Sequence, residues 1–300
     1  MSYKYTVIRF VALFLAFATF IGFFPLNALA KQEEKEVERL IYVIEETMKT
    51  NSSNKDEVFE LQIMLNRILE CNIIVDGLYG TITQGKVEEF QEKYKLEVTG
   101  KVDEVTRKKL NSVYAYLANI KKAMVRVNSY LNVRKGPSTD FDEIGRVYNG
   151  EVYRIYLTKE NWYYIKTKSG QYGWICADYT TGNFVEISIG KQFLTFYLNN
   201  IEILFSPVVT GCVANQDDTP KGIFALTHKS KDTMLMENSL VNYWMRFYMG
   251  IGCHDAPWRT KFGGDIYLTG GSHGCVNMPF IQAELLYKYI EVKTTIVVRE

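Results

Sequence analysis

The sequence has few of the residues that carry much of protein chemistry, with three histidines, five cysteines and six prolines in 300 residues. It also has no charge surplus, because 35 lysines and arginines balance 34 acidic residues and leave a formal net charge of +1. A chain without a basic surplus cannot hold nucleic acid or an anionic membrane by bulk electrostatics. We therefore expect no nucleic-acid partner, and a neutral polymer or a small substrate instead.

The cysteines do not follow the spacing of a disulfide framework, and their number is odd. At least one thiol is therefore expected to be free. For Cys71 and Cys176 we favour the interpretation of small buried apolar residues. The other three are Cys212, Cys253 and Cys275, and the sequence does not fix the redox state of Cys212 and Cys253.

Long apolar runs are absent except near the N-terminus. Lys4 and Arg9 precede the run FVALFLAFATFIGFF, and Ala28-Leu29-Ala30 follows it. A basic start, an apolar run and an A-x-A site predict a secretory signal peptide over residues 1–30. Because the run is close to spanning length, an uncleaved membrane anchor is the alternative. Both interpretations place the rest of the chain outside the cytoplasm.

The segments that follow show helical patterns. Residues 31–55 are rich in Glu and Lys and place Val37, Leu40 and Ile44 at helical spacing, which predicts an amphipathic helical spacer. Three more helical patterns follow over residues 56–118, with Thr83 as a candidate N-cap of the second. They predict a small bundle whose apolar positions are Val58, Leu61, Leu65, Ile68, Val87, Phe90, Tyr94, Val105, Leu110, Val113 and Leu117.

The sequence between these helices repeats itself loosely. The stretches DGLYGTITQGKV and TGKVDEVTRKKL each place a Gly turn ahead of a Thr and then a helix. The region resembles the helical peptidoglycan-binding domain found on many bacterial wall enzymes. Because the matching positions are mostly core and turn residues, the resemblance implies the fold more strongly than binding. These positions are Leu61-Gln62, Asp76-Gly77, Tyr79-Gly80, Thr83, Phe90-Gln91 and Gly100.

After Lys122 the period changes from helical to alternating, in YLNVR, EIGRVY, EVYRIYL, WYYIK and YGWIC. Five short strands with turns between them predict a small β-barrel over residues 124–181. The stretch LNVRKGPSTDFDEIGRVYNG, with NWYYIK and GWI, is similar to a bacterial SH3-like domain, which implies wall anchoring or recognition of wall peptides. Four aromatic residues are candidates for either a ligand groove or the barrel core: Trp162, Tyr163, Tyr164 and Trp174.

Residues 184–300 remain rich in strand patterns, and a single helical pattern, IQAELLYKYIEV, comes near the end. This order does not suit the alternating strands and helices of a Rossmann or hydrolase sheet. Two of the three histidines, His254 and His273, lie near Cys275 in this region, whereas His228 is expected to be solvated in a polar loop.

A thiol is mostly protonated at neutral pH, so a nucleophilic Cys275 needs an imidazole to take its proton. Gly274 has no side chain, which lets backbone N–H groups approach a developing oxyanion. These parts are those of an acyl-transfer site. Zinc is an alternative, because Cys253, His254, His273 and Cys275 are potential ligands. However, neither pair has the gap that lets a loop wrap a metal ion. A purely structural role for Cys275 is the third interpretation.

The stretch VNYWMRFYMGIGCHDAPWRTKFGGDIYLTGGSHGCVNMP resembles the active-site region of the L,D-transpeptidases, the YkuD-type enzymes that crosslink peptidoglycan. Their pattern is a His, a spacer, then [ST]HGC, a hydrophobic residue and Asn or Arg. Here His254 is followed by residues 255–271, then Ser272-His273-Gly274-Cys275 and Val276-Asn277. The resemblance extends from about Phe184 to Glu300, including DTPKGIF, and implies a mainly β catalytic domain.

The resemblance also implies a role for each matching residue. Cys275 corresponds to the nucleophile, His254 to the general base and His273 to a second histidine that lines the site. The backbone carbonyl of Asp255 is expected to orient His254, and the backbone N–H groups of Gly274 and Cys275 to form an oxyanion hole. Substrate-binding positions are expected at Ser272, Asn277, Tyr243, Trp244, Trp258 and Arg259.

The implied function is a peptidoglycan L,D-transpeptidase, which joins the third residues of stem peptides through a cysteine thioester and releases D-Ala. An L,D-carboxypeptidase that trims the same stems is one alternative, and a non-catalytic wall-binding protein is another. No metal or other cofactor is expected. The implied partners are peptidoglycan stem peptides, the bacterial cell wall and carbapenem-type inhibitors.

Overall fold

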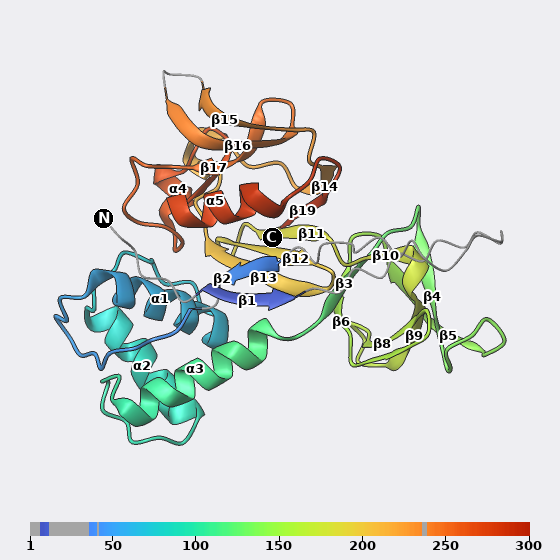
Figure 1. The fold of residues 1–300 in the computed structure, drawn as a ribbon, viewed down its shortest axis with the longest axis horizontal. Coiled ribbons are helices and arrows are strands. Elements are labelled where there is room, and N and C mark those ends of the chain that lie inside the picture. Colours follow the sequence, from blue (N-terminus) through green and yellow to red (C-terminus); the bar gives the residue numbers. More distant parts are fainter. Residues whose placement is uncertain (1–6, 12–35, 41, 236–238) are drawn as a thin grey trace, which may run out of the picture.

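The computed structural model describes residues 7–11, 36–40, 42–235 and 239–300. A helical domain, a small β-barrel domain and a mainly β C-terminal domain follow one another along the chain (Figure 1). This is the predicted multidomain architecture. Of the predicted signal peptide or anchor, the structure describes only β1 (Val7–Val11), so both interpretations remain predictions. Within the described ranges, no helix is long and apolar enough to cross a membrane.

The prediction of a helical spacer over residues 31–55 is wrong for the part that the structure describes. Residues 36–40 form β2 (Glu36–Leu40), which pairs antiparallel with β1, and residues 42–54 contain no helix. Tyr42 and Ile44 are buried on either side of a half-buried Val43, which is the period of an extended chain. The side chain of Asn111 takes the place of helical partners, because it bonds both the backbone N–H and the carbonyl of Ile44 at 2.9 Å.

The three predicted helices are present as α1 (Lys55–Leu69), α2 (Thr81–Lys93) and α3 (Glu104–Ala118). Asn54 and Asp103 cap α1 and α3 by accepting a bond from a backbone N–H of the first turn. The expected cap at Thr83 is wrong, since α2 begins after Gly80 and has no side-chain cap. The hydroxyl of Thr83 is buried and belongs to an internal network instead.

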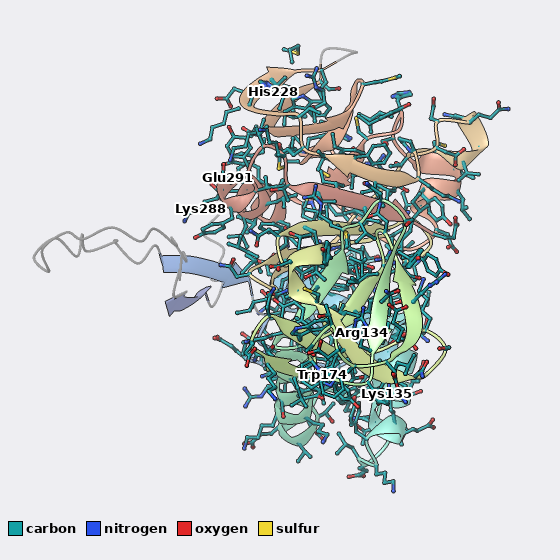
Figure 2. All side chains as sticks on the ribbon, turned by 90° about the vertical axis from the view of Figure 1, so that its right-hand side faces the viewer. Arg134, Lys135, Trp174, His228, Lys288 and Glu291 are labelled. Carbon is teal, nitrogen blue, oxygen red and sulfur yellow. The ribbon has the colours of Figure 1, made fainter. Side chains whose placement is uncertain are left out.

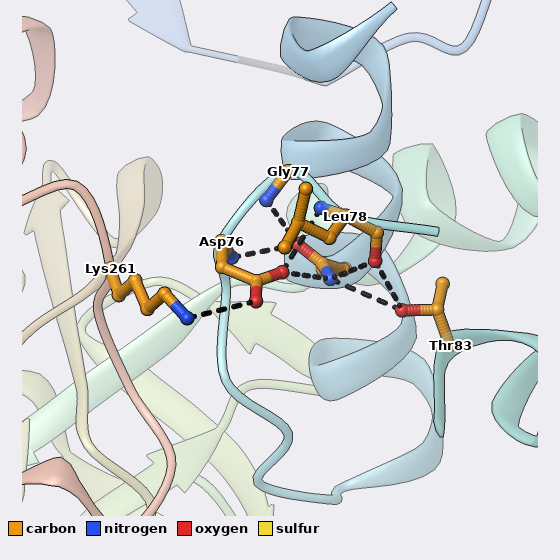
Figure 3. Close-up of polar contacts among 6 residues, drawn as sticks. Asp76, Gly77, Leu78, Thr83 and Lys261 are labelled. Atoms are coloured by element: carbon orange, nitrogen blue, oxygen red, sulfur yellow. Dashed lines mark hydrogen bonds and ion pairs between the residues drawn. The ribbon is translucent and has the colours of Figure 1, made fainter. Parts of the chain in front are cut away.

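That network explains the loose sequence repeat. The side-chain oxygen of Gln62 accepts from the backbone N–H groups of Asp76 and Gly77, both at 2.9 Å, and its amide donates to Thr83 Oγ1 at 3.1 Å (Figure 3). Gln91 repeats the pattern one helix later. It accepts from the N–H groups of residues 99 and 100, both at 3.0 Å, and donates to Thr106 Oγ1 at 3.0 Å. Each buried glutamine therefore ties one turn to the helix after it.

The small β-barrel domain consists of two sheets. One has the order β10-β3-β6 and the other β5-β4-β9-β8-β7. The predicted strand EVYRIYL is divided between two strands, β6 and β7. The strands are β3 (Lys122–Val125), β4 (Tyr130–Arg134), β5 (Glu143–Tyr148), β6 (Val152–Arg154), β7 (Leu157–Lys159), β8 (Trp162–Lys166), β9 (Tyr172–Cys176) and β10 (Thr180–Thr181).

Strand alternation sorts the aromatic residues of this domain. Tyr163 packs against the barrel core, and its hydroxyl donates to Asn200 Oδ1 at 3.3 Å. Tyr164 faces the other way, with its ring centroid 5.1 Å from that of Trp174 and 5.8 Å from that of Tyr172. Figure 2 shows Trp174 on the barrel domain in the lower half of the view, and His228 near the top, in the C-terminal domain.

The C-terminal domain has a five-stranded sheet of order β13-β12-β11-β19-β14 and a four-stranded sheet of order β15-β16-β17-β18. The elements are β11 (Phe184–Ser188), β12 (Phe193–Leu198), β13 (Ile201–Pro207), β14 (Gly222–Ala225), β15 (His228–Met234), β16 (Leu240–Tyr248), β17 (Ile251–Asp255), α4 (Ile266–Gly270), β18 (Val276–Met278), α5 (Phe280–Tyr289) and β19 (Thr295–Arg299). His228 is exposed as predicted, although it begins a strand and does not lie in a loop.

A buried ion pair joins the helical domain to the C-terminal domain. Arg67 of α1 contacts Glu202 of β13, and their side chains are only 16% and 4% exposed. Burial lowers the pKa of Arg67, but the Glu202 carboxylate together with Tyr197 and Tyr114 raises the pKa above its usual range. The guanidinium also lies 4.6 Å from the centroid of the Phe205 ring. Removing one partner of such a pair leaves a buried charge uncompensated.

We therefore expect Arg67→Met to lower the free energy of unfolding by about 3 to 5 kcal/mol, because Glu202 would lose its guanidinium in a buried position. Lys108→Met is the control, since Lys108 and Glu104 form a pair whose side chains are 70% and 65% exposed. Breaking that exposed pair should cost far less than breaking the buried one, because solvent screens the two charges. Urea titrations followed by circular dichroism measure both variants, and equal small losses would contradict the expectation.

Candidate active site

The pairing of β17 with β18 brings the two halves of the predicted site together. These strands are parallel, with His254 opposite Asn277 and Cys253 opposite Val276. Cys275 is the residue before β18, two positions from Asn277, which lies opposite His254 in the pairing. Cys253 lies on the other face, where it is buried in the hydrophobic core with Val276. The two neighbouring residues Cys253 and His254 are thus separated by the sheet.

His254 is fixed in one tautomer. Its Nδ1 lies 2.7 Å from the backbone oxygen of Asp255, which was the expected orienting contact. Because a carbonyl oxygen only accepts, Nδ1 carries the proton and Nε2 keeps its lone pair. The ring is 3% exposed and lies between two tryptophans, with centroid distances of 5.8 Å to Trp244 and 5.9 Å to Trp258. His254 is therefore built as a proton acceptor at Nε2.

The carboxylate of Asp255 holds the backbone next to this contact. It is fully buried and accepts three hydrogen bonds from the facing strand β16. Two come from Asn242, at 2.8 Å from the backbone N–H and 2.7 Å from Nδ2, and one comes from the Tyr243 N–H at 2.8 Å. Asp255 thus orients His254 through its backbone carbonyl, while its side chain fixes Asp255 to β16.

The thiol of Cys275 lies against the turn between β16 and β17. Its Sγ is 3.9 Å from the carbonyl oxygen of Gly250, and burial raises the pKa of the thiol despite a backbone hydrogen bond from Gly252. Burial lowers the pKa of His254, although its contact with Asp255 opposes this effect. At neutral pH the pair is therefore a thiol and a neutral imidazole rather than a thiolate and an imidazolium. Sequence reasoning missed the contribution of this turn, whose only signal is the stretch MGIG before Cys253.

The motif around Cys275 has an unusual backbone. Gly274 has a φ of +101°, a conformation that favours glycine, which accounts for glycine at this position. The hydroxyl of Ser272, expected to bind substrate, donates to the carbonyl oxygen of Cys275 at 2.5 Å. Ser272 thus holds the backbone of the motif through a hydrogen bond inside it.

Several other expected site residues lie around His254. Asn277 is 2% exposed, and its Oδ1 has no hydrogen-bond partner among the described residues. Trp258 is 50% exposed beside the imidazole. Arg259 donates from Nη2 to the carbonyl oxygen of Gly271 at 3.1 Å, which ties the loop after β17 to the start of the motif. His273 is exposed.

The expected substrate-binding position at Tyr243 is corrected by the structure, which places this side chain away from His254. It is next to Trp244 on β16, so the two side chains point to opposite faces of the strand. Trp244 contacts His254, whereas the Tyr243 hydroxyl donates to Glu284 Oε1 on α5 at 2.7 Å and its ring lies 5.5 Å from that of Phe280.

The loop between β17 and α4 is held by the helical domain. The backbones of Val75 and Phe262 exchange two hydrogen bonds, of 2.8 and 3.0 Å. Asn72 Oδ1 accepts from the N–H of Gly264 at 2.9 Å, and Lys261 lies 3.7 Å from Asp76 (Figure 3). Trp258 and Arg259, which belong to the same loop, therefore have a support outside the C-terminal domain.

All five cysteines are free, and Cys71 and Cys176 are half-buried rather than buried as expected. In the part of the chain that the structure describes, no group of three or more His, Cys, Asp and Glu side chains is placed to hold a metal ion.

Three family models match the chain. Residues 182–298 match the L,D-transpeptidase catalytic domain, residues 129–181 the bacterial SH3 domain and residues 54–110 a peptidoglycan binding domain. No curated protein sequence matches the chain.

Several solved structures are similar to the chain. The NMR structure of the catalytic domain of the E. faecium L,D-transpeptidase is 30% identical and covers 39% of this chain and 96% of that one, with a TM-score of 0.35. The same domain acylated by ertapenem is 29% identical. The match covers 39% of this chain and 97% of that one, with a TM-score of 0.35. The crystal structure of a Cys-to-Ser mutant of the Enterococcus faecium L,D-transpeptidase is 23% identical. The match covers 56% of this chain and 74% of that one, with a TM-score of 0.38. At TM-scores below 0.5 these likenesses do not define the fold, and the assignment of residues 182–298 rests on the family model.

If Cys275 is a neutral thiol at pH 7, its reactivity should depend on pH. We expect iodoacetamide to alkylate Cys275 at a rate that rises with pH through a midpoint above the ordinary value of a free thiol, about 8.5. The reason is that burial raises the pKa of this thiol. Peptide mass mapping at several pH values measures the rate at each cysteine separately, and half-exposed Cys176 serves as the internal control. A plateau of Cys275 reactivity that begins below pH 7 would contradict the expectation and indicate a preformed ion pair.

Proposed function

We propose that this chain, which belongs to the L,D-transpeptidase family through residues 182–298, performs its reaction on peptidoglycan with Cys275 as nucleophile and His254 as base. The observation that carries the proposal is the fixed tautomer of His254. The backbone oxygen of Asp255 holds the Nδ1 proton, so Nε2 is the basic nitrogen, and His254 lies on β17, which pairs with the strand that follows Cys275. Nucleophilic acyl transfer from a thiol requires a base whose orientation is fixed.

The first step is acylation of Cys275 by the donor stem. Nε2 of His254 takes the thiol proton while Sγ bonds to the carbonyl carbon between the third stem residue and the terminal D-Ala. The carbonyl oxygen becomes an oxyanion, which the backbone N–H groups of Gly274 and Cys275 stabilise. When the C–N bond breaks, the imidazolium returns the proton to the leaving amine. D-Ala departs, and a thioester remains on Cys275.

The second step consumes the thioester. A side-chain amine from the third residue of a neighbouring stem attacks the carbonyl carbon, His254 takes a proton from the amine, and the C–S bond breaks. The sulfur receives the proton, and the new amide is the crosslink. The half-buried thiol and the tryptophans around His254 keep much of this site away from water, which favours the amine over hydrolysis.

Substrate contacts are proposed for residues that face His254. Asn277 offers a buried side-chain oxygen that no described residue satisfies, which suits an N–H of the stem peptide. Trp258 offers an exposed ring beside the base, and Arg259 keeps donors for a stem carboxylate besides the one that Gly271 uses. Exposed His273 is proposed to face the acceptor amine, and Ser272 acts through the backbone of the motif.

The two preceding domains are proposed to keep the enzyme at its polymer. Both match families of wall-associated modules, and enzymes that act on peptidoglycan work outside the cytoplasm. A signal peptide over residues 1–30, or a membrane anchor if it is not cleaved, is the proposed route to that location. Carbapenems such as ertapenem, which acylates the E. faecium domain, are proposed inhibitors of this chain.

Removal of the thiol is the decisive test. We expect Cys275→Ala to lose at least a thousandfold in the release of D-Ala from tetrapeptide muropeptides, because no other group on the site forms the thioester. Cys176→Ala removes a half-buried thiol from the barrel domain and should keep full activity. Liquid chromatography with mass spectrometry measures D-Ala release, crosslinked dimer and acyl-enzyme in one sample.

The same experiment separates the alternatives. D-Ala release without dimer identifies an L,D-carboxypeptidase. A wild-type chain that binds sacculi but gains no mass with muropeptide or ertapenem identifies a non-catalytic wall-binding protein. Undiminished D-Ala release by Cys275→Ala would end the thiol mechanism.

The role of His254 makes a prediction about pH. Because burial lowers its pKa below 6.5, the imidazole stays neutral at pH 7 and is protonated only in more acidic solution. We therefore expect kcat/KM for acylation to be independent of pH from about 7 to 6.5 and to fall below that range as the base is lost. Stopped-flow acylation by ertapenem gives the profile. A midpoint of the acidic limb above 7 would contradict a neutral base.

A further inference from the structure

Thr219 lies in the stretch DTPKGIF, between β13 and β14, and makes a buried contact with the catalytic motif. It is 2% exposed, and its Oγ1 donates a hydrogen bond to the carbonyl oxygen of Gly274 at 2.8 Å. The same Oγ1 accepts from the backbone N–H of Gly211 at 2.9 Å. The carbonyl oxygen of Gly274 can only accept a hydrogen bond, so the hydroxyl proton of Thr219 must point to it. The bond from the Gly211 N–H then uses a lone pair of the same Oγ1.

The approach of these segments depends on Gly211. A Cβ at this position would lie 1.9 Å from the carbonyl oxygen of Asp217 and 2.6 Å from the N atom of Thr219. Any other residue would therefore push the Thr219 loop away from the motif. The backbones of Gly211 and Gly274, which both bond the Thr219 hydroxyl, therefore fix its position.

The contact sets the direction of a particular N–H group. The structure has no cis peptide bonds in the described residues, so the carbonyl of Gly274 and the N–H of Cys275 point to opposite sides of one planar unit. Thr219 holds the carbonyl toward the interior, which turns the Cys275 N–H the other way. None of the described residues accepts a backbone hydrogen bond from this N–H.

Without this contact the peptide unit would have more freedom than most. It follows Gly274, whose φ is +101° and which has no side chain to restrict rotation. The next carbonyl, that of Cys275, is fixed separately by Ser272 at 2.5 Å. The Gly274 carbonyl is thus the remaining point at which the orientation of the Cys275 N–H can be controlled.

We infer that Thr219 is a positioning residue for the oxyanion hole, a role that rests on the proposed function. By bonding the Gly274 carbonyl, it aims the Cys275 N–H at the oxygen that becomes negative when Sγ attacks. Preorganised donors contribute to the rate because they need no reorganisation as the charge develops. A donor bonded to the carbonyl also polarises the peptide, which strengthens its N–H as a donor.

The experiment compares two reactions of the same thiol in the full chain. Alkylation by iodoacetamide needs the thiol and its base but forms no oxyanion, whereas acylation by ertapenem needs all three. We expect Thr219→Val, which keeps the shape and removes the donor, to slow acylation roughly 10- to 100-fold, somewhat less than the loss of a whole oxyanion donor. Alkylation of Cys275 should stay within about twofold of wild type, since no oxyanion donor acts in it.

Conservative and remote variants complete the design. Thr219→Ser restores the hydroxyl and should recover most of the acylation rate. Thr195→Val removes another buried threonine hydroxyl, on β12, and should leave both reactions unchanged. If Thr219→Val does not fold, Thr219→Ala removes the same donor with no added bulk and takes its place.

The outcomes separate the inference from the proposed function. Slowed acylation with intact alkylation, restored by serine, supports the positioning role. Equal losses in both reactions would mean a general structural role and overturn it, as would wild-type acylation by Thr219→Val. A wild-type chain that is alkylated but never acylated by ertapenem or muropeptide would overturn the proposed function, and this role with it.

Discussion

The parallel pairing of β17 with β18 is the constraint on which the site depends, because it sets His254 beside the strand that Cys275 precedes. Parallel neighbours cannot be joined by a tight turn and need a long crossover. The spacer of residues 255–271 that separates His254 from Ser272 is therefore a geometric requirement. That crossover carries Trp258 and Arg259, so the same connection that closes the fold also supplies the walls of the site.

Burial gives the pair its chemical character. It raises the pKa of Cys275 and lowers that of His254, so the two shifts oppose proton transfer in the resting state. Under the proposed function, such a pair avoids holding two charges in a poorly solvated place, and the proton would move only when the sulfur attacks. In that proposed reaction the fixed Nδ1 proton of His254 would matter more than its basicity, because the orientation of the ring determines whether Nε2 can receive the proton.

Local signals were enough for part of this molecule. The three helices and the Gly turns of the repeat could be predicted because each depends on residues close in sequence, whereas the motif around Cys275 was identified by its resemblance to a family. The segment before the helices could not, since Tyr42 and Ile44 are extended by contacts with Phe205 and Asn111, far along the chain. Tyr243 is an intermediate case. Alternation says that Tyr243 and Trp244 face opposite ways, but only the pairing of β16 with β17 says which of them meets His254.

The loop of residues 72–77 connects the helical domain to the chemistry. On one side Gln62 of α1 bonds the N–H groups of Asp76 and Gly77, and on the other side Val75 pairs with Phe262 in the crossover. Because Gln62 is itself buried, the loop cannot shift without breaking hydrogen bonds inside the helical domain. The crossover that carries Trp258 is thus pinned to the core of a second domain, which supplies the rigidity that a long connection between parallel strands lacks by itself.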